Sequence, residues 1–143
     1  MSFLKKQSAG FFVTLLAIIL AFVSVIFYLI NCNTAYFATY GTDHSIVAMI
    51  IIAIVIEIAY ITGSELVYSN LILDILPCAS SIVLVLAFIS FVQSRVNSIA
   101  SIMTFQNNAQ TMADLSSAII GMVFCFLAIV VCVISSFFRM VKE

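Results

Sequence analysis

The sequence predicts an all-α integral membrane protein, a bundle of four transmembrane helices with an extracytoplasmic helical hairpin that extends the third and fourth helices. The first observation is composition: of 143 residues, 65% are hydrophobic and 8% are charged, whereas a soluble domain has roughly 25% charged residues. A soluble domain of this size still exposes about 30% of its chain surface, so these apolar side chains require lipid. The second observation is four apolar runs near the ~20 residues that cross a ~30 Å bilayer core as a helix.

The apolar runs define one four-span domain, residues 1–143. The predicted spans are residues 11–30, 46–63, 71–91 and 118–138. The runs are continuous rather than alternating, and an isolated sheet in a membrane would leave unpaired edges, so strands are a poor alternative. The first run is longer than the 7–15 apolar residues of a signal peptide and is interpreted as a true span.

Turn-forming residues mark the ends of the second and third spans. Thr42 or Asp43 can accept hydrogen bonds from the free N–H groups that open the second span. Gly63 offers a glycine stop at its end. Ser69 or Asn70 can cap the third span. These residues agree with the boundaries that hydropathy predicts.

The basic residues predict the orientation of the bundle. Lys5 and Lys6 precede the first span, Arg139 and Lys142 follow the last, and Arg95 lies in the connection between spans three and four. Because Lys and Arg are enriched on the cytoplasmic side, both chain ends are expected inside and the connection that holds Arg95 outside. The sequence therefore predicts a multi-pass protein of the cell membrane, of the bacterial cytoplasmic type.

The connection between spans three and four, residues 94–117, reads as a helical hairpin. Apolar residues recur at helical spacing on both sides of a turn near Asn107 and Asn108: Val96, Ile99, Ile102, Met103, Met112, Leu115 and Ile119. At 1.5 Å per residue, a 12-residue arm reaches about 18 Å beyond the membrane.

Two interpretations of the hairpin are open. The aromatic residues of the first outer loop can pack on its apolar stripe, so that loop and hairpin only cover one another, or they can lie at the membrane interface. Alternatively, the hairpin and loop form a docking surface for a partner outside the cell. That predicted surface consists of Tyr36, Phe37, Tyr40, Arg95, Ile99, Met103, Phe105, Asn107, Asn108 and Met112.

Glu57 is the one ionisable residue predicted deep inside a span. A charge there costs at least about 2.5–3.5 kcal/mol, so such residues usually face the bundle and mark function. Because burial disfavours the ionised form, Glu57 is expected to be protonated and to donate to Ser81 or a backbone carbonyl. With Tyr60 one turn away and Ser80 and Ser81 at matching depth, it forms the predicted intramembrane polar site.

No pattern indicates catalysis, a cofactor or a metal. The chain contains no HExxH, no GxSxG and no pair of intramembrane aspartates, so we expect no enzyme activity. The net charge of −1 indicates no nucleic-acid partner. Three cysteines, Cys78, Cys125 and Cys132, fall inside spans and Cys32 at an outer edge, which favours packing over a disulfide framework.

Two functions remain as hypotheses. The first is a small accessory or scaffolding protein that binds a protein partner, or a second copy of itself, through the outer hairpin and helix faces. The alternative is an oligomeric transporter or channel coupled to protons or cations through Glu57, although that residue can equally act as interhelical glue worth about 0.6–2 kcal/mol.

The stretch from Arg95 to Met103, RVNSIASIM, resembles small four-helix membrane proteins of Gram-positive anaerobic bacteria. The layout of four spans with both ends inside is also similar to that of tetraspan families such as MARVEL-type proteins. These resemblances imply a four-helix membrane fold and assign no function.

Overall fold

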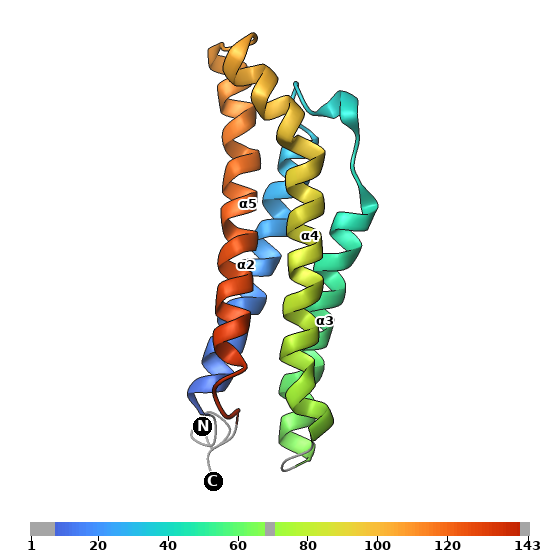
Figure 1. Ribbon diagram of the computed structural model, residues 1–143, viewed down its shortest axis with the longest axis vertical. Coiled ribbons are helices and arrows are strands. Elements are labelled where there is room, and N and C mark those ends of the chain that lie inside the picture. The colour runs from blue at the N-terminus through green and yellow to red at the C-terminus, as the bar shows by residue number, and fades with distance from the viewer. Residues whose placement is uncertain (1–7, 68–70, 141–143) are drawn as a thin grey trace.

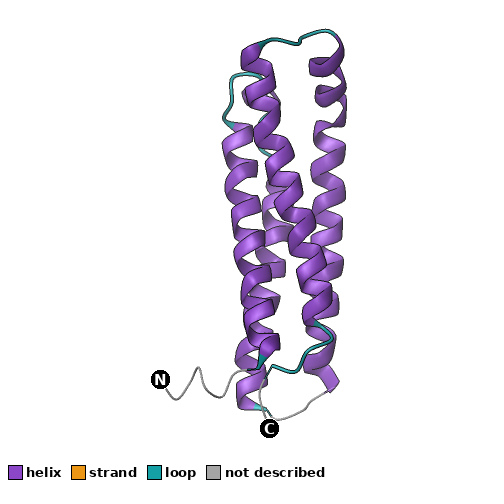
Figure 2. Ribbon diagram, turned by 90° about the vertical axis from the view of Figure 1, so that its left-hand side faces the viewer, coloured by secondary structure: helices purple, strands orange, loops and turns teal. Residues whose placement is uncertain are grey.

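The computed structural model describes residues 8–67 and 71–140, and within these ranges the regular structure is helical throughout (Figures 1 and 2). The elements are α2 (Ala9–Cys32), the short 3₁₀ helix η1 (Ala38–Tyr40), α3 (His44–Leu66), α4 (Leu71–Thr104) and α5 (Ala109–Ser135). Each of the four α-helices is long and apolar enough to cross a membrane. The prediction of an all-helical bundle with four apolar spans is confirmed.

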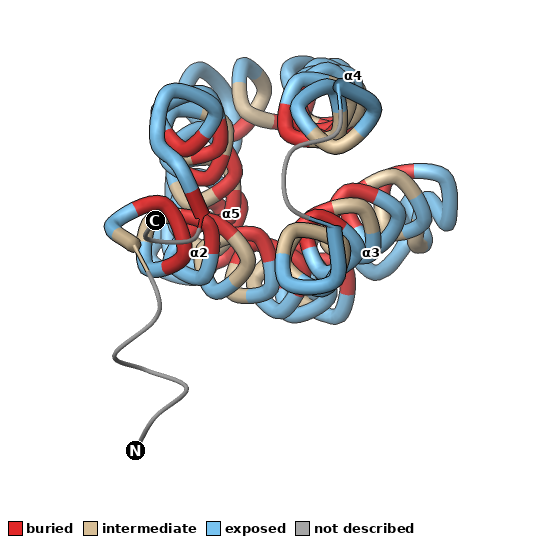
Figure 3. Tube along the Cα trace, turned by 90° about the horizontal axis from the view of Figure 1, so that it is seen from below, coloured by how far each residue is buried: buried red, intermediate tan, exposed pale blue. Residues whose placement is uncertain are grey.

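The four long helices form two close pairs. Helix α2 packs along α5, and α3 packs along α4, while α4 also contacts α5 and α2 contacts α3. Within the described residues, the backbones of α3 and α5 do not come into contact. Seen along the bundle axis, buried residues line the sides of the helices that face the centre (Figure 3). The boundary between α3 and α5, called here the seam, is therefore bridged by side chains.

The two ends of the bundle differ. Residues 33–43 and 105–108 connect helices at one end, called here the upper end because Figure 1 draws it at the top. Helix α2 begins and α5 ends at the opposite, lower end (Figure 1). There the backbone N–H of Ser8 donates to the Met140 carbonyl at 3.0 Å. This hydrogen bond joins the segments before α2 and after α5.

Small residues let α2 and α5 approach closely, as is usual for helices that associate in a membrane. The buried small residues are Ala17, Ala21 and Ser24 on α2 and Gly121 and Ala128 on α5. The hydroxyl of Ser24 donates to the Gly121 carbonyl at 3.0 Å. A Cβ atom on Gly121 would lie only 3.1 Å from the Phe91 ring. Gly121 therefore sets the spacing at this level of the bundle.

The turn residues predicted at the two ends of the second span have different outcomes. Asp43 caps α3, because its carboxylate accepts from the Ser45 N–H at 2.9 Å. Gly63, predicted to stop that helix, lies inside it instead, and a Cβ there would lie 2.5 Å from Leu73 Cδ2. It allows α3 and α4 to approach closely. Ser69 and Asn70 lie outside the described residues.

The hairpin prediction agrees with the path of the chain. Helix α4 runs without a break through the third span and the first hairpin arm, and α5 continues the second arm into the fourth span. The fourth span ends at Ser135 rather than residue 138, because residues 136–138 turn back onto the last carbonyls of α5. With 34 residues, α4 is about 50 Å long, well beyond a ~30 Å hydrocarbon core.

Candidate functional site

The intramembrane polar site surrounds Glu57, whose side chain is 2% exposed. Its Oε1 atom accepts a hydrogen bond from the Cys132 thiol at 2.9 Å. Its Oε2 atom is buried and has no hydrogen-bond partner among the described residues. The carboxyl therefore joins α3 to α5 through one oxygen and leaves the other without a partner.

The hydroxyl groups of Ser80 and Ser81 lie beside the hydrogen bond between Cys132 and Glu57. Ser81 donates to the Pro77 carbonyl at 2.8 Å, and its hydroxyl lies 3.2 Å from Cys132 Sγ. Ser80 donates to the Ala53 carbonyl of α3 at 3.1 Å and lies near the Glu57 carboxyl. The direct hydrogen-bond partner of Glu57 is thus Cys132. Ser81, the expected partner, contacts Cys132 instead. The reason is that Cys132 on α5 points across the seam, between Ser81 and Glu57.

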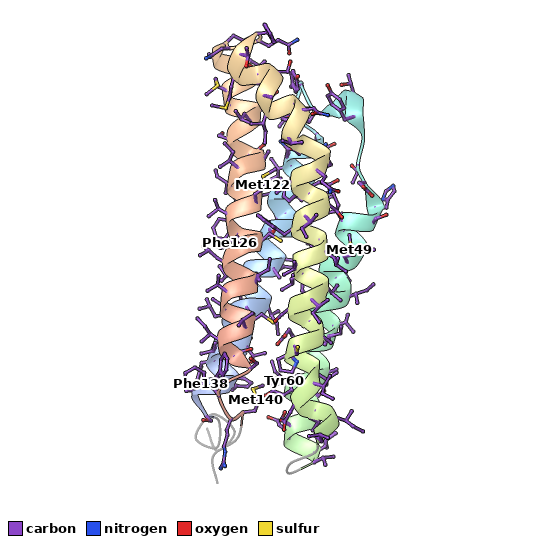
Figure 4. The ribbon with its side chains drawn as sticks, viewed as in Figure 1. Met49, Tyr60, Met122, Phe126, Phe138 and Met140 are labelled. Atoms are coloured by element: carbon purple, nitrogen blue, oxygen red, sulfur yellow. The ribbon has the colours of Figure 1, made fainter. Side chains whose placement is uncertain are left out.

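Tyr60 lies below Glu57 on the same side of α3 and is 5% exposed. Its acidic neighbours are Asp74 and Glu57. Asp74 stands in the first turn of α4 and is exposed. Figure 4 labels Tyr60 on α3 and Met140 after α5, both toward the lower end of the bundle. All four predicted members of the polar site therefore come from the lower half of α3 and α4.

A lateral pocket of about 280 Å³ lies between α4 and α5 beside this site. It is lined by Cys78, Ser81, Ile82, Val85, Leu86, Val133 and Ser136. Ser81 belongs to both the pocket wall and the Glu57 site. Within the described residues, no group of three His, Cys, Asp or Glu side chains could hold a metal ion.

A second polar site occupies the upper end around Arg95, which is 2% exposed. Its Nε donates to Asn31 Oδ1 at 2.9 Å, and its Nη2 donates to Cys32 Sγ at 3.1 Å. The guanidinium carbon lies 5.0 Å from the Phe37 ring centroid and 5.6 Å from that of Tyr28, distances at which the ring faces attract a cation. Arg95 is thus enclosed by α2 and the first connection.

Asp114 is the buried anion at the same end, with 4% of its side chain exposed. Its two carboxylate oxygens accept from the Tyr36 N–H at 2.9 Å and from Gln110 Nε2 at 2.8 Å. The side-chain amide of Asn31 bridges Asp114 and Arg95. Its Nδ2 donates to the backbone carbonyl of Asp114 at 3.1 Å, and its Oδ1 accepts from Arg95 Nε. Among the described residues, no direct ion pair joins Arg95 to a carboxylate.

This network holds the first connection against the hairpin. Phe37 is fully buried and packs with Ile102 and Leu115, while Tyr36 and Ile99 cover the cluster. The predicted packing of the loop aromatics on the apolar stripe of the hairpin is thus observed. Two residues of the predicted docking surface, Arg95 and Phe37, lie in the interior, because the loop closes over the guanidinium. The sequence feature that points to this buried site is the presence of one arginine and one aspartate, Arg95 and Asp114, on opposite arms of an otherwise uncharged hairpin.

The remaining docking candidates lie on the outside. Phe105 is 86% exposed, Met103 62% and Tyr40 61%. Met112, Asn107 and Asn108 are also exposed. The turn is well ordered by a capping box, in which Asn108 Oδ1 accepts from the Thr111 N–H at 2.9 Å and the Asn108 N–H donates to the Thr111 hydroxyl at 3.1 Å. Exposed apolar side chains therefore stand on a firmly held turn.

The four apolar helices define the class of the molecule, a multi-pass membrane protein whose helix faces suit a lipid bilayer. No protein-family model matches the chain, and neither a curated protein nor a solved structure matches it. Function must therefore be argued from the two sites themselves.

Proposed function

We propose that the protein is a small accessory membrane protein that binds a protein partner through the hairpin tip, defined as Met103, Phe105, Asn107, Asn108 and Met112. The observation that carries the proposal is the exposure of Phe105 and Met103 on an ordered turn. In this proposal both chain ends face the cytoplasm and the tip projects on the other side of the membrane. The basic Arg139, at the lower end, agrees with that orientation.

The chemistry of the tip favours protein over lipid as its partner. Residues 96–113 contain no charged side chain, and the fully buried centre of a protein interface is depleted of charge and enriched in Phe and Met. Burial of a phenylalanine is favourable by about 1.5–3 kcal/mol. The side-chain amides of Asn107 and Asn108 are exposed at the same tip. Insertion of the tip into hydrocarbon is unfavourable because these amides would lose their hydrogen bonds to water.

The first prediction concerns Phe105→Asp in full-length protein purified from its native membrane in mild detergent. A buried central contact is typically worth 2 kcal/mol or more, so recovery of the partner should fall about thirtyfold, because the new carboxylate would be desolvated at the interface. The measurement is quantitative mass spectrometry of the copurifying proteins.

Phe137→Asp is the matched control, because Phe137 is 81% exposed at the opposite end of the bundle. It should leave the recovery of the partner unchanged. A photocrosslinker at position 105 should yield a discrete protein adduct that the same group at position 137 does not. Adducts with lipid alone would contradict the proposal, and an adduct with a second copy would replace the partner by a homo-oligomer.

The unpartnered Oε2 atom of Glu57 favours a second candidate function, an oligomeric transporter coupled to protons or cations. Four spans enclose no pore by themselves, so the path would require at least a dimer. In this reading Glu57 binds the coupling ion at the seam between the helix pairs. The same atom is the reason to test the residue even if the tip proves to bind a partner.

The second prediction is that Glu57→Gln abolishes proton or cation flux into proteoliposomes and leaves stability unchanged. The glutamine carbonyl still accepts from Cys132, whereas the amide cannot exchange a proton. Flux is measured with a pH-sensitive dye inside the vesicles, and Glu65→Gln, an exposed position on the same helix, is the control. Equal flux in both variants would rule out the transporter.

A further inference from the structure

We infer that Glu57 is an intramembrane proton-binding site that opens toward the lower end of the bundle past Tyr60 and is closed toward the upper end. This inference is independent of partner binding at the hairpin tip, and it deepens the second candidate function by naming the ion and the side from which it arrives. It rests on the hydrogen bonds of Glu57 and on the unequal surroundings of that residue along α3.

The two carboxyl oxygens point to a group that holds a proton. Oε1 has its donor in the Cys132 thiol, whereas Oε2 has no partner among the described residues. An ionised carboxylate is only an acceptor and needs donors on both oxygens. Burial of a charge without such partners costs far more than burial of a neutral hydroxyl. The surroundings therefore suit the protonated carboxyl, and release of the proton requires water or movement at the seam.

The route toward the lower end is polar. One turn below Glu57, Tyr60 is buried on the same side of α3, and Glu57 and Asp74 are its acidic neighbours. Asp74 is exposed in the first turn of α4. In the inferred path, a proton from the lower end passes this phenol before it reaches Glu57.

The route toward the upper end is apolar. On the side of α3 that holds Glu57, the next buried residues upward are Ala53, Ile50 and Ile46, each no more than 1% exposed. They belong to the main hydrophobic core with Leu84, Ala87 and Phe91 of α4. These side chains of α3 and α4 offer no group that could relay a proton, and the Tyr28 and Cys32 side chains of the same core lie on α2 toward the upper end. The access of Glu57 is therefore one-sided.

The titratable groups that face Glu57 come from three helices. Tyr60 lies on α3, Asp74 acts from α4 through Tyr60, and Cys132 reaches the carboxyl from α5. Among the described residues, α2 contributes no titratable contact to Glu57. A change in the protonation of Glu57 would act directly on the Cys132 contact, the hydrogen bond that joins α3 to α5. Proton release would strengthen that contact, because an ionised carboxylate is the better acceptor, and would leave a charge at Oε2 that needs water.

Dicyclohexylcarbodiimide, an apolar reagent that dissolves in the bilayer, tests the inference on the full chain in proteoliposomes. A protonated carboxyl gives its proton to a carbodiimide nitrogen while its oxygen bonds to the central carbon. The adduct rearranges to a stable N-acylurea, so one reagent molecule is added and nothing is lost. Peptide mass spectrometry should place the adduct on Glu57 at neutral pH. Glu57→Gln should lack it, whereas Glu65→Gln should retain it.

Sidedness is tested with vesicles in which the protein has one known orientation. Raising the pH on the side of the lower end should reduce labelling, by about tenfold per pH unit once Glu57 is ionised. The same change on the upper side should have no effect. Tyr60→Phe should slow the response to a pH jump, followed by the infrared band of the protonated carboxyl, without changing the final extent.

Three outcomes would overturn the inference. These are an absence of labelling of Glu57 in folded protein, labelling that ignores pH, and labelling that follows the pH of the upper side. Flux measurements remain separate, because a protein that is labelled as expected but moves no ions keeps the proton site and loses only the transporter. Co-elution of wild type and Glu57→Gln in gel filtration confirms that loss of labelling is not loss of fold.

Discussion

Replacement of Asn31 by leucine should lower the free energy of unfolding by about 3 kcal/mol and release the first connection from the hairpin. Asn31 is fully buried. Its Oδ1 is the acceptor of Arg95 Nε, and its Nδ2 donates to the Asp114 carbonyl and to the Ser117 hydroxyl. Leucine has a similar shape, so the expected loss comes from hydrogen bonds rather than from a cavity.

The size of the effect follows from the buried charge. A hydrogen bond to a charged group contributes about 1.5–3 kcal/mol, and a buried group left without its partner costs a further 1–3 kcal/mol. In the variant, the guanidinium of Arg95 keeps Cys32 Sγ, a weak acceptor, as its remaining hydrogen-bond partner. The two aromatic rings beside it do not replace an oxygen acceptor.

Unfolding in mixed detergent micelles measures the global effect, and limited proteolysis of residues 33–43 measures the local one. Asn33→Leu is the control, because Asn33 is exposed and donates to the Leu29 carbonyl of its own helix at 2.7 Å. A surface change of this kind usually stays within about 0.5 kcal/mol. Equal losses in the two variants would show that Asn31 contributes no more than a surface residue.

The second large effect is expected for Gly121→Leu, which should destabilise the fold by about 2–3 kcal/mol. The first added carbon would lie 3.1 Å from the Phe91 ring and 3.3 Å from Phe27 Cβ. Phe91 has little room to move, because it is fully buried and its ring meets Tyr28 edge-on at 4.8 Å. Added carbons in a packed core typically cost 1–3 kcal/mol.

The same unfolding assay checks this prediction, with Val123→Leu as the control two residues away. Val123 is 50% exposed on the outside of α5, so a larger side chain there meets lipid or detergent and should leave stability unchanged. If Gly121→Leu unfolds like the wild type, α2 and α5 are not held at the close distance that Gly121 and Ser24 indicate.

The amino-acid sequence predicts part of the Glu57 site and part of the Arg95 site. Glu57 stands out because a carboxyl within an apolar run is costly at any depth, and Ser80, Ser81 and Tyr60 follow from helical spacing. Cys132 was interpreted as a packing residue, although its depth in the fourth span matched that of Glu57. Its role as the direct partner depends on the rotation of α5 about its axis, which span depth does not reveal.

At the upper end, sequence reasoning recognised the elements but not their roles. The helical arms, the turn near Asn107 and the packing of the loop aromatics follow from local patterns. The burial of Arg95 does not, because it depends on Asn31, which lies 64 residues earlier in the chain. An arginine in a polar connection is most often solvated, and only the closed loop converts it into an interior residue.

The class of the protein, the four helices and their approximate boundaries are predictable from the amino-acid sequence. These depend on composition, on run length and on turn chemistry, which are local. Which side of each helix faces its neighbours depends on the packing of the four helices. In a soluble helix an apolar stripe marks that side, but here the lipid-facing side is equally apolar, with exposed residues such as Phe22, Val55 and Ile82. The pairing of Glu57 with Cys132 and of Arg95 with Asn31 therefore emerged only from the packed helices.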